Sequence, residues 1–304
     1  MMSVSKIFLS AYCLLFSFSI FAQQAPEGTT SELVILNVKS GERKTIFKEV
    51  RHFEAPNWSR DGEFLIINSG GHLEKVDLDG NKLGQILPDK IARANNDHGL
   101  SFDGELLVIS KSDEGTSSRI YTVPLTGGEP KLITPNHPSY WHGISPDGKT
   151  LVYCAQRDGA WDIYSIPTIG GDEKRITTTE GLDDGPEYSY DGKWIYFNSN
   201  RTGRMHAYRM KPDGTGAEQL TDDELDNWFP HPSPDNKSAV MISYLEDQKG
   251  SHPFGKDVKL RLIDVETKEI KDLTPVFYGG QGTINVHSWS PDGEWISFVI
   301  YHKP

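Results

Sequence analysis

The chain has 304 residues, and 43 acidic residues against 31 lysines and arginines give it a formal net charge of −12. The basic residues form neither a stripe nor a cluster, which argues against a nucleic acid or an anionic membrane as the partner. The length is sufficient for one large core.

The N-terminal segment has the features of a secretory signal peptide. Lys6 supplies a positive charge, residues 7–21 are apolar apart from a few serines, and Ala22 ends a cleavage-like site. The apolar stretch is short for a membrane span, although an uncleaved anchoring helix is the alternative. We expect residues 1–22 to be removed and the protein to be periplasmic or secreted. Cys154 then remains alone, without a disulfide framework.

A Ser-x-Asp-Gly-like turn recurs six times in the rest of the chain, each time between short apolar, β-rich runs. Successive aspartates are 42, 44, 44, 44 and 57 residues apart. A strand-built period of roughly 40–45 residues is typical of a β-propeller with one four-stranded blade per repeat. The six turns lie at residues 59–62, 101–104, 145–148, 189–192, 233–236 and 290–293.

Each repeat is predicted to form one blade. One strand leads into the turn, a second leaves it, and a Gly-Gly or Asp-Gly turn joins the third strand to the fourth. The first five blades are expected over residues 51–90, 91–135, 136–178, 179–222 and 223–275.

The sixth blade requires both ends of the chain. Its repeat, residues 276–304, has one strand after the turn, so residues 31–49 are expected to complete it and close the ring. The 57-residue interval indicates a long loop over 245–257, between the second and third strands of blade five. The sequence therefore predicts an all-β, six-bladed propeller of antiparallel blades, a single domain over residues 23–304.

Several motifs carry a family resemblance. Trp-Ser-Arg-Asp-Gly (58–62), Ser-Pro-Asp-Gly-Lys (145–149) and Phe-Asn-Ser-Asn-Arg-Thr-Gly (197–203) resemble the propeller repeats of the TolB family. The resemblance covers residues 31–304 and implies a periplasmic six-bladed propeller that works with envelope protein partners. The repeats also resemble, more weakly, those of oligogalacturonate lyases, which have seven blades and place a histidine-bound manganese on the channel.

Histidines share one position in three repeats. His98, His142 and His287 each lie three residues before the turn serine, and Glu187 and His231 lie one position further along in repeats four and five. In a propeller these positions are at the channel mouth. Imidazoles with a carboxylate suit a divalent metal (Mn, Zn or Ca), for which we predict His98, His142, His287 and Glu187 as ligands, with His142 and His231 as catalytic groups. Alternatively, the histidines hydrogen-bond to the backbone and seal the ring.

Cationic and aromatic residues gather near the same mouth. On an acidic protein such cations suit an anionic ligand, and tryptophans can stack on sugar rings. The alternative is that the arginines cap loops and the tryptophans pack between blades. The predicted ligand-binding residues are Trp141, Trp161, Arg201, Arg204, Trp228, Lys256, Gln281 and Asn285.

Two functions are compatible with these features. The favoured one is a monomeric, TolB-like binding or scaffold module that grips an envelope protein or a glycan over its channel mouth. The alternative is a metal-dependent carbohydrate-active enzyme, a lyase acting on an acidic oligosaccharide whose carboxylate Arg201, Arg204 or Lys256 neutralises. Convergence of three imidazoles would favour the enzyme, and separately bonded histidines would favour the scaffold.

Overall fold

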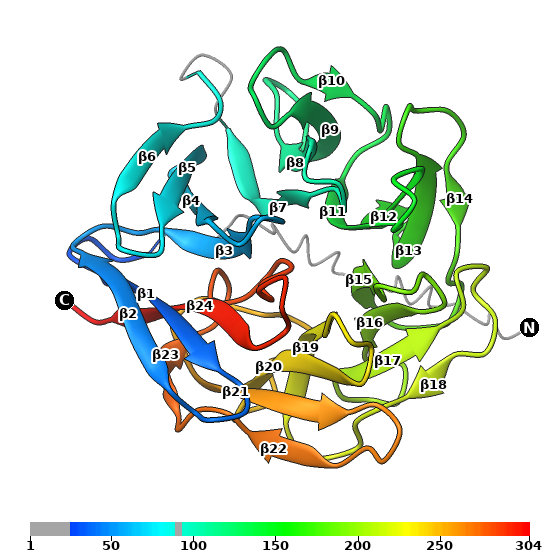
Figure 1. The fold of residues 1–304 in the computed structure, drawn as a ribbon. Coiled ribbons are helices and arrows are strands. Elements are labelled where there is room, and N and C mark those ends of the chain that lie inside the picture. The colour runs from blue at the N-terminus through cyan, green and yellow to red at the C-terminus, as the bar shows by residue number, and fades with distance from the viewer. Residues whose placement is uncertain (1–24, 89–92) are drawn as a thin grey trace, which may run out of the picture.

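The computed structural model describes residues 25–88 and 93–304, which form six antiparallel sheets arranged in a ring (Figure 1). This confirms the predicted six-bladed propeller. The predicted signal peptide, residues 1–22, lies outside the described residues. In the described part of the chain, no helix is long and apolar enough to cross a membrane.

Blades one to five each run in chain order from the channel to the rim. Their innermost strands are β3 (Glu54–Trp58), β7 (Ala94–Leu100), β11 (Ser139–Ile144), β15 (Asp183–Tyr188) and β19 (Asp226–Pro232). The second strands are β4 (Phe64–Ser69), β8 (Leu106–Lys111), β12 (Thr150–Arg157), β16 (Ile195–Ser199) and β20 (Ser238–Tyr244). The third strands are β5 (His72–Asp77), β9 (Arg119–Pro124), β13 (Ala160–Pro167), β17 (His206–Met210) and β21 (Lys256–Asp264). The outermost strands are β6 (Lys82–Gln85), β10 (Lys131–Leu132), β14 (Lys174–Arg175), β18 (Glu218–Gln219) and β22 (Ile270–Asp272).

Blade six is built from both ends of the chain, as predicted. β24 (Trp295–His302) pairs antiparallel with the whole of β1 (Thr30–Asn37), whose other edge pairs with β2 (Arg43–Glu49). The N-terminal and C-terminal strands lie side by side in Figure 1. Residues 283–289 occupy the inner position, where the Ser297 amide donates to the Ser288 carbonyl at 2.9 Å. This pairing leaves neither β1 nor β24 with an open edge.

The long fifth interval contains two additions rather than one. Residues 245–255, which we call the insertion loop, join β20 to β21, so the loop ends slightly before the predicted 257. A short strand that the sequence did not predict, β23 (Phe277–Gly279), then pairs with the start of β21. The insertion loop lies beside the channel mouth, whereas β23 extends the sheet of blade five next to blade six.

The same side-chain hydrogen bonds fix all six repeated turns. In each, the serine hydroxyl donates to the aspartate Oδ1 at 2.5 to 2.8 Å. That Oδ1 also accepts the backbone amide two residues later. The fourth position has a positive φ, which glycine tolerates best, and Asn236 takes it in blade five with φ of 60°. The turns are therefore specified locally by their own sequence.

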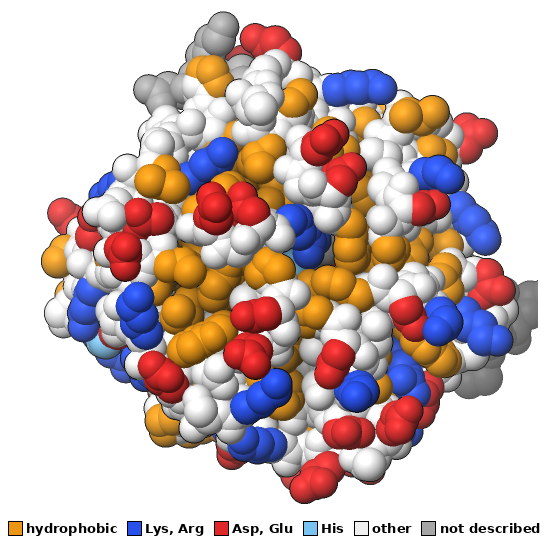
Figure 2. All heavy atoms as spheres, in the orientation of Figure 1, with side chains coloured by type: hydrophobic (Ala, Val, Ile, Leu, Met, Phe, Trp, Pro, Cys, Tyr) orange, Lys and Arg blue, Asp and Glu red, His pale blue; other side chains and the backbone are white. Residues whose placement is uncertain are grey.

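The hydrophobic core lies between neighbouring blades. One cluster joins Leu33 of β1 and Val299 of β24 to Leu65 and Val76 of blade one, all four fully buried. Burial across this boundary stabilises the closed ring. Figure 2 shows acidic and basic side chains interspersed over one face, with hydrophobic side chains between them toward the centre.

Shortening Leu33 tests the closure of the ring. We expect Leu33→Ala to lower the free energy of unfolding by about 2–5 kcal/mol, because it leaves a cavity between the last and first blades. The control is Val50→Ala, at a side chain that is 75% exposed, for which the change should stay within about 0.5 kcal/mol. Urea denaturation measures both. Equal small effects would contradict the structural role of the N-terminal strand.

Candidate functional site at the channel mouth

Bulges in the inner strands shape the channel. In β3, β7, β11, β15 and β19 the pairing with the second strand shifts register just before or around the histidine position. Ala55, Gly185 and Phe229, at equivalent places in three of these strands, have φ of 52°, 63° and 52°. A bulge bends the strand and re-aims its side chains. The polar residues of the candidate site flank these bulges.

Glu187 of β15 bridges two histidines from the next two blades. Its Oε2 lies 2.5 Å from His231 Nδ1, and its Oε1 lies 2.9 Å from His287 Nδ1. The outer ring nitrogens are also bonded: His231 Nε2 lies 2.8 Å from the Ile284 carbonyl oxygen, and His287 Nε2 lies 2.8 Å from the Tyr190 hydroxyl. All four imidazole nitrogens of this pair are therefore engaged.

The Glu187 carboxyl group of this bridge is ionised at neutral pH. Burial alone would raise the pKa of Glu187, but the charges and hydrogen bonds of His231 and His287 lower it to about 2. Because the three residues come from blades four, five and six, the bridge ties together the inner strands of half the ring.

A second buried pair lies at the mouth. His142 Nε2 is 3.3 Å from Asp184 Oδ1, and His252 Nε2, from the insertion loop, is 3.8 Å from Asp184 Oδ2. The His252 ring packs edge-on against Trp228 with centroids 4.6 Å apart. Burial alone would raise the pKa of Asp184, but the histidines lower it. The insertion loop of blade five thus reaches the inner strand of blade four.

His98 of β7 lies apart from both pairs. It is fully buried, and within the described residues neither of its ring nitrogens makes a well-formed hydrogen bond. Burial lowers its pKa to about 4, so the imidazole is neutral at neutral pH.

The predicted metal ligands are therefore divided among three places. Glu187 and His287 lie together, His142 pairs with Asp184, and His98 is separate. Over residues 25–88 and 93–304, no three His, Cys, Asp or Glu side chains are arranged to hold a metal ion. As placed, these residues do not fit one metal centre, and we derive no chemistry through a metal. The predicted catalytic pair is separated in the same way, since His231 belongs to the Glu187 bridge and His142 does not.

The three predicted aromatic contacts differ in exposure. Trp141 and Trp228 are 2% and 0% exposed, in cores of blades three and five. Trp161 is half-buried, with its ring centroid 5.9 Å from that of Tyr140. Trp141 and Trp228 therefore pack between blades, and Trp161 alone of the three presents surface near the mouth.

Both predicted arginines have acidic partners. Arg201 Nη2 lies 2.9 Å from Asp183 Oδ1, and Arg204 Nη1 lies 3.6 Å from Asp226 Oδ1. The two aspartates are nearly fully buried. These ion pairs fix the arginines on the sheets of blades four and five.

The remaining predicted contacts surround the insertion loop. Lys256 begins β21 at the end of the loop and is half-buried, and the Gln281 amide lies 3.3 Å from the Pro253 carbonyl oxygen of the loop. Asn285 is 1% exposed and accepts the Gly282 amide at 2.6 Å. The structure thus brings these three residues to the same side of the mouth.

Sequence reasoning missed two acids of the mouth. Glu54, the first residue of β3, has a side chain that is 13% exposed, and burial together with Asp97 raises its pKa to about 8. Burial and Asp184 raise the pKa of Asp97 to about 6, although His142 opposes the shift. Glu54 lies five residues before its turn serine, as Asp184 does in repeat four, so aligning that position would have found Glu54. Asp97 lies four residues before its turn serine, where no other repeat has an acid, and nothing in the sequence signalled it.

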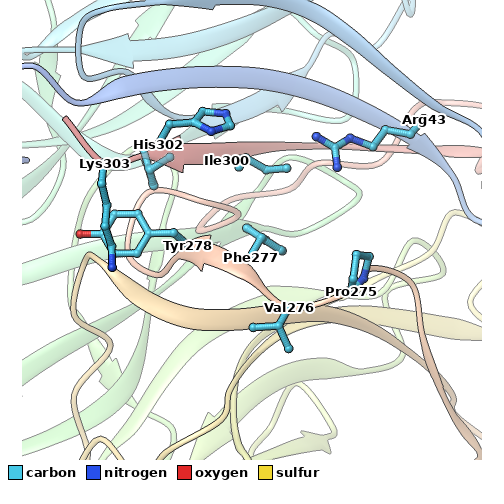
Figure 3. Close-up of a pocket in the computed structure, with 9 residues that line it drawn as sticks. Arg43, Pro275, Val276, Phe277, Tyr278, Ile300, His302 and Lys303 are labelled. Atoms are coloured by element: carbon cyan, nitrogen blue, oxygen red, sulfur yellow. The ribbon is translucent and has the colours of Figure 1, made fainter.

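A surface groove lies beside blade six, away from the inner strands. Its volume is about 550 Å³, and it runs between β23 and the end of β24. Figure 3 shows Arg43 and Lys303 toward its two ends, with Phe277 and Ile300 between them. None of the predicted site residues lines it.

The closed ring of four-stranded blades defines a six-bladed β-propeller, and comparison with known proteins identifies its family. Residues 138–303 match the family described as the TolB beta propeller domain. An uncharacterized protein of Agrobacterium fabrum (strain C58) is 45% identical over 272 residues, which cover 89% of this chain and 92% of that protein. The chain belongs to the TolB β-propeller domain family.

Solved structures agree with this assignment. A TolB-like protein from Agrobacterium tumefaciens superposes with a TM-score of 0.86 at 43% identity, over 91% of this chain and 99% of that one. TolB from Acinetobacter baumannii gives a TM-score of 0.63 at 19% identity, over 84% and 66%. An oligogalacturonate lyase in complex with manganese gives 0.56 at 18% identity, over 88% and 78%. The last two share the fold alone.

His98 generates a prediction for the pH dependence of stability. Its folded pKa of about 4 lies below the unfolded value of 6.5, so between pH 6.5 and 4 the unfolded chain binds a proton that folded His98 does not. Stability is therefore lost as the pH falls through this window, by about 3 kcal/mol from this group. We expect His98→Gln to show a shallower decline in urea unfolding at pH 7, 6, 5 and 4. The exposed His137→Gln serves as control, and parallel curves for wild type and His98→Gln would refute the assignment.

The engaged histidines generate a prediction about metals. Elemental analysis of the purified protein is expected to find no stoichiometric manganese, zinc or calcium that depends on His142 and His287. The reason is that their nitrogens face Asp184, Glu187 and Tyr190. Stoichiometric metal that disappears in a His142→Ala/His287→Ala double variant would contradict this prediction. It would favour the metal-dependent enzyme.

Proposed function

We propose that this protein is a periplasmic or secreted binding module that holds an envelope protein over the mouth of its propeller channel. The insertion loop is the observation that carries the proposal. In a propeller, function sits on the loops around the channel. This chain places the insertion loop, together with the largely buried residues Glu54, Asp184 and His142, at one end of that channel.

The insertion loop is held by residues from several blades. His252 reaches Asp184 of blade four, and Phe254 packs on Tyr301 of blade six with ring centroids 4.6 Å apart. Phe254 also lies edge-on to His52, before blade one, at 5.6 Å. Contacts on three sides make the loop a preorganised rim, which lowers the ordering cost of binding.

Family membership supports the same function. The TolB resemblance implies a periplasmic protein that works with envelope protein partners, and it requires no further chemistry. The metal-dependent lyase receives less support from this arrangement. Its predicted donors lie in three places, and Arg201 and Arg204, proposed to neutralise a substrate carboxylate, already pair with Asp183 and Asp226.

Site-specific photo-crosslinking in intact cells tests the proposal. A photoreactive residue in place of Gln281, at the mouth, is expected to give an adduct with one discrete envelope protein. The matched control is Lys149, an exposed turn residue at the opposite end of an inner strand, which should give none. Unfolding midpoints equal to wild type show that both variants fold.

The outcomes separate the alternatives. The same adducts from both positions, or none from either, would remove the channel mouth as the binding site. A heterogeneous glycan adduct from position 281 would show that the partner is a glycan and not a protein.

A further inference from the structure

We infer that the channel mouth contains a site for a primary ammonium group, such as a lysine side chain of the partner, beside Glu54 and Tyr301. The inference rests on the proposed function and names the chemical group that the mouth recognises. It is carried by a carboxyl group that has no lysine or arginine partner among the described residues, and by buried polar atoms close to it.

The carboxylates at the mouth outnumber the cations available to them. Glu54, Asp97 and Asp184 come from blades one, two and four. The charge of Asp97 contributes to the raised pKa of Glu54, and the charge of Asp184 contributes to the raised pKa of Asp97. His142 and His252 contact Asp184. Among the described residues, no lysine or arginine forms an ion pair with Glu54.

The neighbour of Glu54 is a poor source of positive charge. His52 Nε2 lies 3.9 Å from Glu54 Oε2, but burial lowers the pKa of His52 to about 4. The imidazole is therefore neutral at neutral pH and leaves the carboxylate uncompensated. Burying a carboxylate without a partner is unfavourable, which is why its pKa is raised to about 8. A bound ammonium group would remove that penalty.

A second observation independently marks a ligand position. Tyr301 is 1% exposed, and within the described residues its hydroxyl has no hydrogen-bond partner. Gly282 lies between this hydroxyl and Glu54, because a Cβ added at Gly282 would overlap both Tyr301 Oη and Glu54 Oε2. The two oxygens therefore lie close together, packed against a backbone position that leaves no room for a side chain. The Nε2 atom of His52 is also buried and unpartnered in the described part of the chain.

The chemistry of these groups favours a compact cation. A carboxylate, a phenolic oxygen and a neutral imidazole nitrogen can each accept a hydrogen bond, and an ammonium group has three to donate. The walls are aromatic: His52 stacks on Tyr301 at 5.4 Å, and Phe254 of the insertion loop covers Tyr301. Aromatic faces attract cations. Acceptors this close together suit a compact ammonium better than the broader, planar guanidinium.

Direct binding of a small probe tests the inference. Calorimetric titration with Nα-acetyl-lysine amide is expected to show saturable binding, whereas the same molecule acetylated at Nε should not bind. We expect Glu54→Gln to weaken binding at least about tenfold, because it removes the carboxyl group that ionises when the ammonium binds. Tyr301→Phe should weaken it severalfold while keeping the ring. Glu63→Gln, at an exposed acid in the turn at the opposite end of the channel, should bind like wild type.

Each other outcome counts against the site. Equal binding by wild type and Glu54→Gln, equal binding of the acetylated probe, or no binding at any attainable concentration would overturn it. Stoichiometric binding of calcium or manganese that excludes the lysine probe would assign the site to a metal instead. If the probe fails while crosslinks from position 281 persist, the ammonium site is wrong and the proposed function stands.

Discussion

The antiparallel pairing of β1 with β24 closes the ring and thereby positions every other blade. It joins the two ends of the chain along the whole of β1 and so fixes six inner strands around one channel. Residues distant in sequence become neighbours as a result, including Glu54 with Tyr301 and Glu187 with His287. Without closure, blade six would be incomplete and its sheet would present open edges.

The polar residues of the channel divide into two groups with different roles. Glu187, His231 and His287 are saturated with hydrogen bonds to one another and to neighbouring groups, and they tie three blades together. Within the described residues, the Tyr301 hydroxyl at the mouth has no hydrogen-bond partner, and no lysine or arginine forms an ion pair with Glu54. A fully hydrogen-bonded network stabilises the ring. A carboxyl group without a cationic partner is instead a place where a ligand can form a new ion pair.

The sequence was sufficient for the architecture because the signals are local. Each Ser-x-Asp-Gly turn is held by its own side chains, and its spacing sets the blade. The candidate site could not be predicted in the same way, because it is formed by residues from different blades of the ring. His98 and His142 share a position in their repeats, yet His98 lies among backbone groups whereas His142 meets an aspartate from the next blade. His252 belongs to an insertion outside the repeat, so no alignment of repeats could place it against Asp184.

Titration of the Glu54 carboxyl group by carbon-13 NMR is the most direct test of this account. Glutamate-labelled protein, with Glu54→Gln to assign the signal, reports the ionisation of this one group. We expect a pKa of about 8 in the free protein and a lower pKa when Nα-acetyl-lysine amide saturates the mouth. An ordinary glutamate pKa that is unchanged by the probe would show that Glu54 is already compensated and would contradict the binding role of the channel mouth.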